Sequence, residues 1–346
     1  MTKPRKAEGR VSTKGAPGPL VSACIIAGNS EDCIGRCLTS LGQLADEINV
    51  HLAGSRDGTE RIARRFGARI TRSEWRKDFA YHRNRSLAMA TGRFQLVIDT
   101  DESVEDTDKA ETRRRLRSAG VPDLLMVREK LTFPNGHTMT MLAPRLLRAS
   151  RNMRYVYPIH EHLDVIDEPA ALSNITICHH GYATEESVTR KEERNLAIAQ
   201  SMGEHPHGLH SVARSAMALA MWDLAVSAAR KLVEMKKGHE PPVQDVTRVE
   251  TCAIGAACAI SAEDLDTASW FVEKGREVDP TAPDILLVAV QAAGIRYLAE
   301  AERHNLTSPG AFIRPTVFVH NLARARQGLS LLRGQPGSDS PGTKEA

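Results

Sequence analysis

The stretch that decides the fold runs from Arg83 to Glu102 and reads RNRSLAMATGRFQLVIDTDE. Its first part predicts a helix that ends at Gly92, and the apolar run 94–98 predicts a buried strand. Asp99 and Asp101 follow where that strand ends. Open α/β sheets bind their ligands at the carboxyl ends of the strands. Two carboxylates at that edge therefore predict a site for a hard divalent cation, which also binds the oxygens of a diphosphate.

An acidic loop is the alternative interpretation of these carboxylates. Glu105, Asp106 and Asp108 follow within a few residues, and an isolated D-x-D pattern is common by chance. The helix and the strand that precede Asp99 make the pattern more specific, and the cation site is the interpretation that we favour.

Alternating strands and helices come before the decisive stretch. Strands are expected at 21–27, 46–52 and 68–71, with helices at 30–44 and 60–66 between them. This order predicts a parallel sheet with right-handed crossovers. The rest of the domain is expected to contain a charged helix at 110–119, strands at 123–127 and 130–133, a hairpin turn at 134–137, and strands at 143–148, 155–157 and 173–178.

The chain changes character after Tyr182, where residues with helical periodicity, rich in Ala and Leu, replace the strands. Two segments, 222–235 and 264–280, look alike at a spacing of about 43 residues, whereas tetratricopeptide repeats are spaced by about 34. Such helix pairs stack into surfaces that bind peptides, although this array could equally brace the fold or mediate dimerisation. We expect a disordered basic tail at 1–19, an α/β domain at 20–185, a helical domain at 190–333 and a disordered tail at 334–346.

Bulk composition narrows the class of protein. The 346 residues allow two domains, and 41% hydrophobic with 26% charged residues suit a soluble globular protein. A net charge of +3 is too small to argue for nucleic acid or for an anionic membrane. The six cysteines form no C-x-x-C pair, and no apolar run reaches about 18 residues. A cytoplasmic protein without a membrane span or a signal peptide is the expectation.

Seven short segments of the chain occur in the order in which the family 2 glycosyltransferases of the GT-A fold carry them. They are Val21–Ile26 as the first strand, Asn29 with Glu31, Gly54–Thr59 (G-S-x-D-G-T), Trp75 to Asn84 (W-x-x-D-F and R-N), Asp99–Glu102 (D-A-D-E), Ile159–Glu161 (I-H-E) and His179–Tyr182 (H-x-G-Y). The chain resembles this family, and more closely the subgroup whose catalytic domain carries a helical, tetratricopeptide-like tail. The resemblance covers residues 20–185 and, more weakly, 190–335.

The resemblance implies a fold and an activity. The fold would be α/β, a GT-A domain with a mostly parallel, Rossmann-like sheet, followed by an all-α tetratricopeptide-like domain. The activity would be a metal-dependent, inverting transfer of a sugar, with a hexose from a UDP-sugar as the expected donor group.

The metal site implied by the resemblance contains Asp99, Asp101 and His179. Asp99 would also lie near the nucleoside or ribose of the donor, and Asp101 is the first choice as metal ligand. Imidazole suits Mn²⁺ better than Ca²⁺. Mn²⁺ or Mg²⁺ would offset the charge that builds on the leaving diphosphate. The alternative for His179 is a hydrogen-bonded structural histidine.

Glu161 is the candidate general base, because inversion needs a carboxylate opposite the leaving group to take the proton of the acceptor. It lies 60 residues after Asp101, a spacing that fits the family, and Asp164 is the reserve. His160 would orient Glu161 or contact the diphosphate. The alternative for Glu161 is a loop ion pair with an arginine such as Arg154.

The donor pocket implied by the resemblance is lined by Asn29, Gly54, Ser55 and Asp57, and closed by Arg83 and Asn84. Leu52 stands where the family usually has an aspartate that reads the uracil imide, and Gly28 replaces the usual lysine. Leaving the imide unpaired would cost about 1–3 kcal/mol. Either Asp57 or a backbone carbonyl reads the base, or the donor is not a uridine nucleotide.

The acceptor stays open at this point. A peptide held by the helical tail, a saccharide, or a modified base in nucleic acid are all compatible with the layout, the last because of the basic tail and the arginines of 113–117. The sequence is also compatible with a homo-oligomer. A competing hypothesis is a non-catalytic scaffold, a decayed transferase domain that carries a peptide-binding helical array. The lost lysine and aspartate favour it, and the retained Asp99-x-Asp101, Arg83-Asn84 and 159–161 oppose it.

Overall fold

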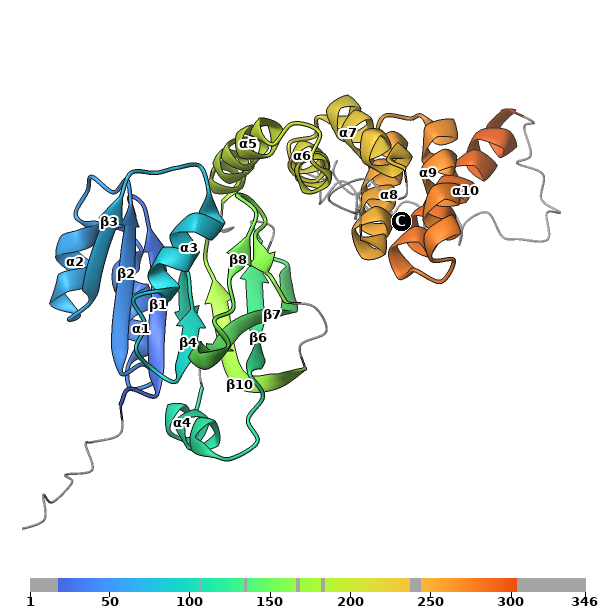
Figure 1. Ribbon diagram of the computed structural model, residues 1–346. Helices are drawn as coiled ribbons and strands as arrows, with labels where there is room; N and C mark the ends of the chain where they lie inside the picture. The colour runs from blue at the N-terminus through green and yellow to red at the C-terminus, as the bar shows by residue number, and fades with distance from the viewer. Residues whose placement is uncertain are drawn as a thin grey trace, which may run out of the picture.

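The computed structural model describes residues 18–105, 107–133, 136–165, 169–181, 184–236 and 244–303. An eight-stranded sheet forms the first part of the chain, and helices form the second (Figure 1). The sheet has the strand order β3-β2-β1-β4-β7-β6-β10-β5. Its strands are β1 (Val21–Ala27), β2 (Glu47–Ala53), β3 (Arg69–Ser73), β4 (Phe94–Val97), β5 (Glu102–Val104), β6 (Leu124–Thr132), β7 (Thr138–Arg148) and β10 (Ala170–His179).

The first half of the sheet is parallel, as the alternation of strands and helices predicts. β1 lies between β2 and β4, parallel to both, and β3 continues the sheet beside β2. Helices α1 (Ile34–Leu41) and α2 (Thr59–Arg65) make the crossovers. Helix α1 buries Ile34, Cys37, Leu38 and Leu41, which share one face at helical spacing. β1, with six of its seven residues buried, is the centre of this half.

Helix α3 (Phe79–Leu87) ends five residues earlier than predicted. The sequence predicts a helix up to Gly92, but the carbonyl of Leu87 accepts hydrogen bonds from the Ala90 backbone and the Gln95 side chain. The helix begins at Asp78, whose carboxylate accepts from the Tyr81 backbone N–H at 2.8 Å.

The second half of the sheet is mixed. β7 is antiparallel to both β4 and β6, and β10 is parallel to β6 and antiparallel to β5. The β6–β7 hairpin is present, because Thr132 pairs with Thr138, while Pro134 and Asn135 of the predicted turn lie outside the described residues. β7 and β10 are longer than the predicted strands at 143–148 and 173–178. The first five residues of β7 are all exposed and the first five of β10 are exposed or half-buried, so neither extension has the apolar pattern that predicts a strand.

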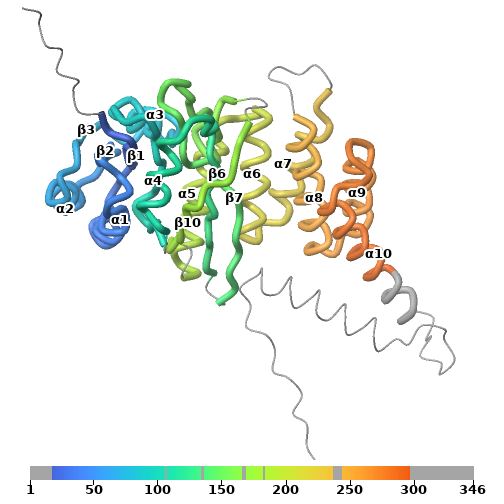
Figure 2. The backbone as a smooth tube through the Cα atoms, turned by 90° about the horizontal axis from the view of Figure 1, so that it is seen from below, coloured from blue at the N-terminus to red at the C-terminus, as the bar shows by residue number. Residues whose placement is uncertain are grey.

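Helices of the second part follow one another away from the sheet (Figures 1 and 2). They are α5 (Glu185–Ser201), α6 (Pro206–Ala218), α7 (Trp222–Glu234), α8 (Asp245–Ser261), α9 (Leu265–Val278) and α10 (Pro283–Arg303). Each packs against the next in the chain, as stacked helix pairs do. The prediction of an α/β domain with a mostly parallel sheet, followed by an all-helical part, is confirmed.

The helical core reaches back to the α/β part. Ile159 is buried in the same apolar cluster as Leu209 and Leu232, and Trp75 and Phe79 pack against that cluster. The exact domain boundaries stay predictions, and most of the predicted tails, 1–17 and 334–346, lie outside the described residues. Among the helices of the described ranges, none combines the length and the apolar character needed to cross a bilayer.

Candidate active site

Arg83 connects two of the predicted site residues. It projects from α3 and is 8% exposed. Its Nε lies 2.5 Å from Glu161 Oε1, while Nη1 and Nη2 lie 2.7 and 2.9 Å from the two oxygens of Asp99. Burial alone would raise the pKa of Asp99, but Arg83 more than compensates and holds it well below its ordinary value. Asp99 is therefore an anion tied on both oxygens.

A second arginine, Arg145, contacts Asp99 and two further acids. Arg145 of β7 donates from Nη2 to Glu102 at 2.9 Å and to Glu129 at 3.2 Å, and its Nη1 lies 3.6 Å from Asp99. Glu102 is 0% exposed, and its second oxygen accepts from the Asp99 backbone N–H at 2.7 Å. Burial, together with the charges of Asp99 and Glu129, raises the pKa of Glu102 despite the attraction of Arg145.

Asp101 lies beside this network with different partners. Lys191 of α5 places its Nζ 2.7 Å from Asp101 Oδ2. His179, at the end of β10, has its Nε2 3.9 Å from Asp101 Oδ1. The backbone N–H of His180 donates to the Asp101 carbonyl at 2.9 Å. The D-x-D turn is therefore fastened to β10 and to the first helix of the second part.

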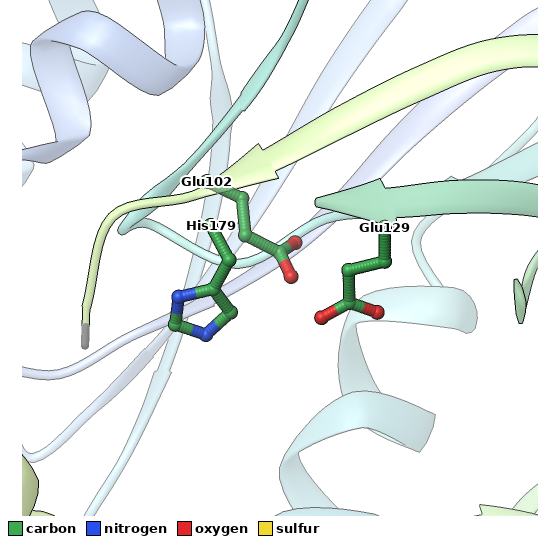
Figure 3. Close-up of side chains that lie close together, drawn as sticks. All are labelled: Glu102, Glu129 and His179. Atoms are coloured by element: carbon green, nitrogen blue, oxygen red, sulfur yellow. The ribbon is translucent and has the colours of Figure 1, made fainter. Parts of the chain in front are cut away.

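Two groups of side chains have the chemistry to hold a divalent cation. Glu102, Glu129 and His179 bring ligand atoms within 4.8 Å of one another, with the two carboxylates facing each other (Figure 3). Arg145 already donates to both of these carboxylates, so a cation there would have to displace a buried guanidinium. Asp101 and His179 form the second group. An ion about 2.1 Å from each ligand atom spans up to about 4.2 Å, which matches their separation of 3.9 Å.

The ring of His179 sets a condition on metal binding. The backbone N–H of Gly181 donates to His179 Nδ1 at 3.0 Å, so in the neutral ring the proton lies on Nε2. A metal needs the lone pair of Nε2. His179 therefore becomes a ligand only if Nδ1 takes the proton and the Gly181 N–H turns away. Of the three predicted ligands, Asp101 and His179 fit a cation in type and in span once the His179 ring and the Gly181 N–H rearrange, whereas both oxygens of Asp99 are bonded to Arg83.

The predicted donor pocket is built around the turn after β2. Gly54 has φ +69°, and a Cβ there would lie 3.1 Å from Trp75 Cβ, so glycine is needed. Asp57 accepts from the Thr59 backbone and hydroxyl and from the Glu31 backbone, and Asn29 accepts from the Arg56 backbone. A hollow of about 250 Å³ adjoins the turn. It is lined by Leu52, Gly54, Ser55, Arg56, Arg72, Ser73 and Glu74.

Three predicted residues have other surroundings than expected. Both ends of the Asn84 amide pair with the backbone of Tyr155, at 2.8 and 2.9 Å, which joins α3 to β8 (Tyr155–Val156). His160 adjoins α6: burial, followed by the charges of Arg214, His207 and His210, lowers its pKa to about 3. Asp164, just after β9 (His162–Leu163), is exposed and donates its backbone N–H to the Arg154 carbonyl. No contact in the described part of the chain joins these three to Asp99.

The segment that carries Glu161 is strained and clamped. Tyr157 and His160 have φ values of +72° and +47°, which bulky residues rarely adopt. The Pro158 carbonyl accepts from the Phe79 backbone N–H at 2.8 Å, and the Ile159 carbonyl lies 2.7 Å from His207 Nε2. His207 also stacks on Tyr157 at 4.0 Å between ring centroids. Helices α3 and α6 together set the position of Glu161.

Comparison with known proteins finds a family model that matches part of the α/β domain. Residues 22–135 match the model of glycosyl transferase family 2, a range that includes Asp57, Arg83, Asp99 and Asp101. Over these residues the α/β domain is similar to the family 2 glycosyltransferases.

Two curated relatives each match more than half of the chain. A TPR repeat-containing protein of Synechococcus elongatus is 28% identical over 66% of this chain and 59% of its own length. The SPbeta prophage-derived glycosyltransferase SunS of Bacillus subtilis is 24% identical over 53% of this chain and 45% of its own. The chain thus spans about half the length of the curated relatives that it matches. Among solved structures, S. aureus TarS with UDP-GlcNAc aligns over 75% of this chain and 92% of its own at 15% identity, but its TM-score of 0.42 is too low to carry a conclusion.

Three residues of this site are not marked as site residues by the sequence. Arg145 and Glu129 lie in strands and enter the site through the β6–β7 pairing. Arg145 is a charged residue between apolar neighbours in β7, which is a weak local signal. Glu129 stands between Arg128 and Lys130, so its strand pattern does not single it out. Lys191 lies 90 residues beyond Asp101 on a helix with many charges, and nothing local marks it.

Proposed function

We propose that the protein is an inverting glycosyltransferase that moves a sugar from a nucleoside-diphosphate sugar to an acceptor. The observation that carries the proposal is the guanidinium of Arg83 between Asp99 and Glu161. It brings an acid of the donor motif and the candidate base to one point at the carboxyl end of β4. Retention of the whole arrangement, and the name of the SunS relative, support an enzyme over the non-catalytic scaffold.

Glu161 is the group to which we assign the acceptor's proton. Its side chain is 10% exposed, so the carboxylate is reachable and yet largely desolvated. Arg83 binds its Oε1 through Nε alone, and we assign the second oxygen to the acceptor hydroxyl, thiol or amide. The clamp on 157–160 holds this carboxylate in place during the reaction. Asp164 stays the reserve, and its exposure makes it the weaker candidate.

The donor would lie between the Gly54–Thr59 turn and Asp101. We assign Asn29, Gly54, Ser55 and Asp57 to the nucleotide side, and a uridine diphosphate-hexose as the expected donor. A divalent cation, Mn²⁺ or Mg²⁺, held by Asp101 and His179, would supply charge compensation for the leaving diphosphate. Asp99 stays out of that ligand set in this proposal, because Arg83 occupies both of its oxygens.

A saccharide or a peptide is the acceptor class that we favour over nucleic acid. In the arginine run, Arg113 pairs with Asp46, and Arg114 and Arg115 pair with Glu111. Paired guanidinium groups offer less charge to phosphates. The helical part next to Glu161 is the surface that we expect to hold the acceptor.

Substitution of Asp101 tests this function. We expect Asp101→Ala to remove Mn²⁺-dependent binding of UDP and turnover without unfolding the protein, because Asp101 and Lys191 are each about one quarter exposed. Calorimetric titration of UDP with and without Mn²⁺ measures the first effect, and release of nucleoside diphosphate from a panel of nucleotide-sugars measures the second. Asp266→Ala, which removes a 97% exposed carboxylate on α9, is the control. Equal UDP affinity with and without Mn²⁺, in both the wild type and Asp101→Ala, would remove the metal from the proposal.

A further inference from the structure

Lys191 is the residue through which the helical part enters the site. Helix α5 begins with a reciprocal cap, in which Thr184 and Ser187 each bond the other's backbone, and Lys191 follows on the next turn. Its Nζ lies 2.7 Å from Asp101 Oδ2, and the two side chains are 24% and 25% exposed. This ion pair joins the first helix of the second part to the acid that we assign to the metal.

The Lys191–Asp101 pair packs closely against the backbone of Gly181. A Cβ on Gly181 would lie 2.1 Å from both Asp101 Oδ2 and Lys191 Nζ, and 2.8 Å from His179 Cε1. Ser187 Oγ donates to the Gly181 carbonyl at 3.1 Å, which holds the turn against α5. The bare backbone at residue 181 is therefore what lets ammonium, carboxylate and imidazole meet.

A divalent cation and this ammonium compete for one carboxylate. An ion between Asp101 Oδ1 and His179 would lie beside the Lys191 ammonium and repel it. The other acids of the site already have cationic partners among the described residues: Asp99 and Glu161 bind Arg83, while Glu102 and Glu129 bind Arg145. A displaced ammonium would therefore need an anionic partner other than these four acids, and the diphosphate of a bound donor is such an anion.

We propose that Lys191 is a donor-site residue that neutralises Asp101 until the divalent cation binds and then contacts the diphosphate of the donor. This inference rests on the proposed function. It gives α5 a role in the chemistry of the site, beyond bracing the fold or holding the acceptor.

Lys191→Met tests the competition with the cation and the contact with the diphosphate separately, because it keeps the apolar stem of the side chain and removes the ammonium. With Mn²⁺ alone, calorimetry should show Lys191→Met binding the ion about threefold or more tighter than wild type, since no ammonium competes. With saturating Mn²⁺, its affinity for UDP should fall about tenfold or more, as expected for the loss of one charged hydrogen bond. Lys231→Met is the matched control, because Lys231 of α7 makes a similar 2.8 Å pair with Glu204 in the turn between α5 and α6, away from the site.

The outcomes are distinct. Unchanged Mn²⁺ affinity in Lys191→Met overturns the competition, and unchanged UDP affinity overturns the diphosphate contact. Wild type that binds no nucleoside diphosphate (UDP, GDP, ADP or CDP) with Mn²⁺ overturns the proposed function itself, and the role of Lys191 with it. Circular dichroism reports whether Lys191→Met is folded. If it is not, Lys191→Gln takes its place, because it keeps a hydrogen-bond donor near Asp101 without the charge. Lys191→Gln should shift the affinities for Mn²⁺ and for UDP in the same directions.

Discussion

Arg83 and Asp99 form a two-pronged ion pair at 2.7 and 2.9 Å, and the remaining nitrogen of the same guanidinium binds Glu161 at 2.5 Å. One side chain on α3 thereby sets the distance between the donor motif and the candidate base. Arginine suits this task because its planar fork makes several directed bonds at once, which lysine cannot do.

Loss of Arg83 should damage both stability and activity. Arg83→Met leaves Asp99 and Glu161 as largely buried carboxylates without their cation, and breaking such a pair costs about 3–5 kcal/mol. Urea unfolding measures the loss, and nucleoside diphosphate release measures turnover. Arg113→Met is the control, because it removes an arginine pair with Asp46 that lies away from the site. It should lower the free energy of unfolding by less, because this pair is more exposed to solvent than Arg83 with Glu161. If the two variants are equally stable and both turn over substrate, Arg83 has no special role.

Glu161→Gln tests the assignment of the base. The amide keeps the shape and a hydrogen-bonding oxygen but cannot take a proton, so the transfer rate should fall by about 10²–10⁴ while donor affinity holds. Single-turnover transfer and UDP titration measure the two quantities. Asp164→Asn is the comparison: near wild-type transfer in Glu161→Gln, together with a loss in Asp164→Asn, would move the assignment to Asp164. Collapse of donor binding in Glu161→Gln would make Glu161 a donor contact or a structural residue.

Discrimination among nucleobases should be weak. Leu52 lines the hollow beside the Gly54 turn, and Asp57 already accepts hydrogen bonds from Ser55, Thr59 and Glu31. Neither offers a ready acceptor to the uracil imide. Thermal shifts with UDP, GDP, ADP and CDP in the presence of Mn²⁺ should therefore differ little. A preference for UDP above about 4 kcal/mol, beyond what one hydrogen bond supplies, would mean that another residue reads the base.

Stability should fall when the pH drops from about 6.5 towards 4. Burial lowers the pKa of His51, His207 and His210 to about 4 and that of His160 to about 3, so the folded state keeps them neutral. The unfolded chain binds protons at these histidines below about pH 6.5, so stability is full above that pH and is lost as the pH approaches 4. Each histidine contributes up to about 1.4 kcal/mol per pH unit.

Glu102 changes the folding stability in the opposite direction over part of this pH range. Burial raises its pKa to about 8, so its contribution is lost as the pH rises from about 4.5 to 8. Four histidines outweigh one carboxyl below pH 6.5, and the urea midpoint should be highest near that value. His210→Asn should flatten the acid slope, whereas Lys231→Gln, which does not titrate there, should leave it unchanged. Equal midpoints at about pH 5 and about pH 6.5 would contradict the prediction.

Local patterns were enough for the order of elements in the parallel half of the α/β part, but not for the other half, where the two strands predicted at 123–127 and 130–133 form the single strand β6. Alternating apolar strands and amphipathic helices predict the parallel half correctly, because period and turn residues act within a few positions. They were less successful at the ends of elements. α3 stops at Leu87 instead of Gly92, where the Leu87 carbonyl accepts from the Ala90 backbone and from Gln95 of the next strand. β7 extends through exposed residues, and β10 through exposed and half-buried ones.

The sequence by itself determined the parallel half of the α/β domain, the positions of Asp99 and Asp101 after a buried strand, and the helical second part, because each depends on short runs of residues. Only the tertiary structure decided which cation meets which acid. Arg145 reaches Glu102 and Glu129 through antiparallel pairing, Arg83 reaches Glu161 across 78 residues, and Lys191 reaches Asp101 across 90. Such pairs are selected by proximity and burial in the folded chain, where an unpaired charge is costly, and no local pattern records them.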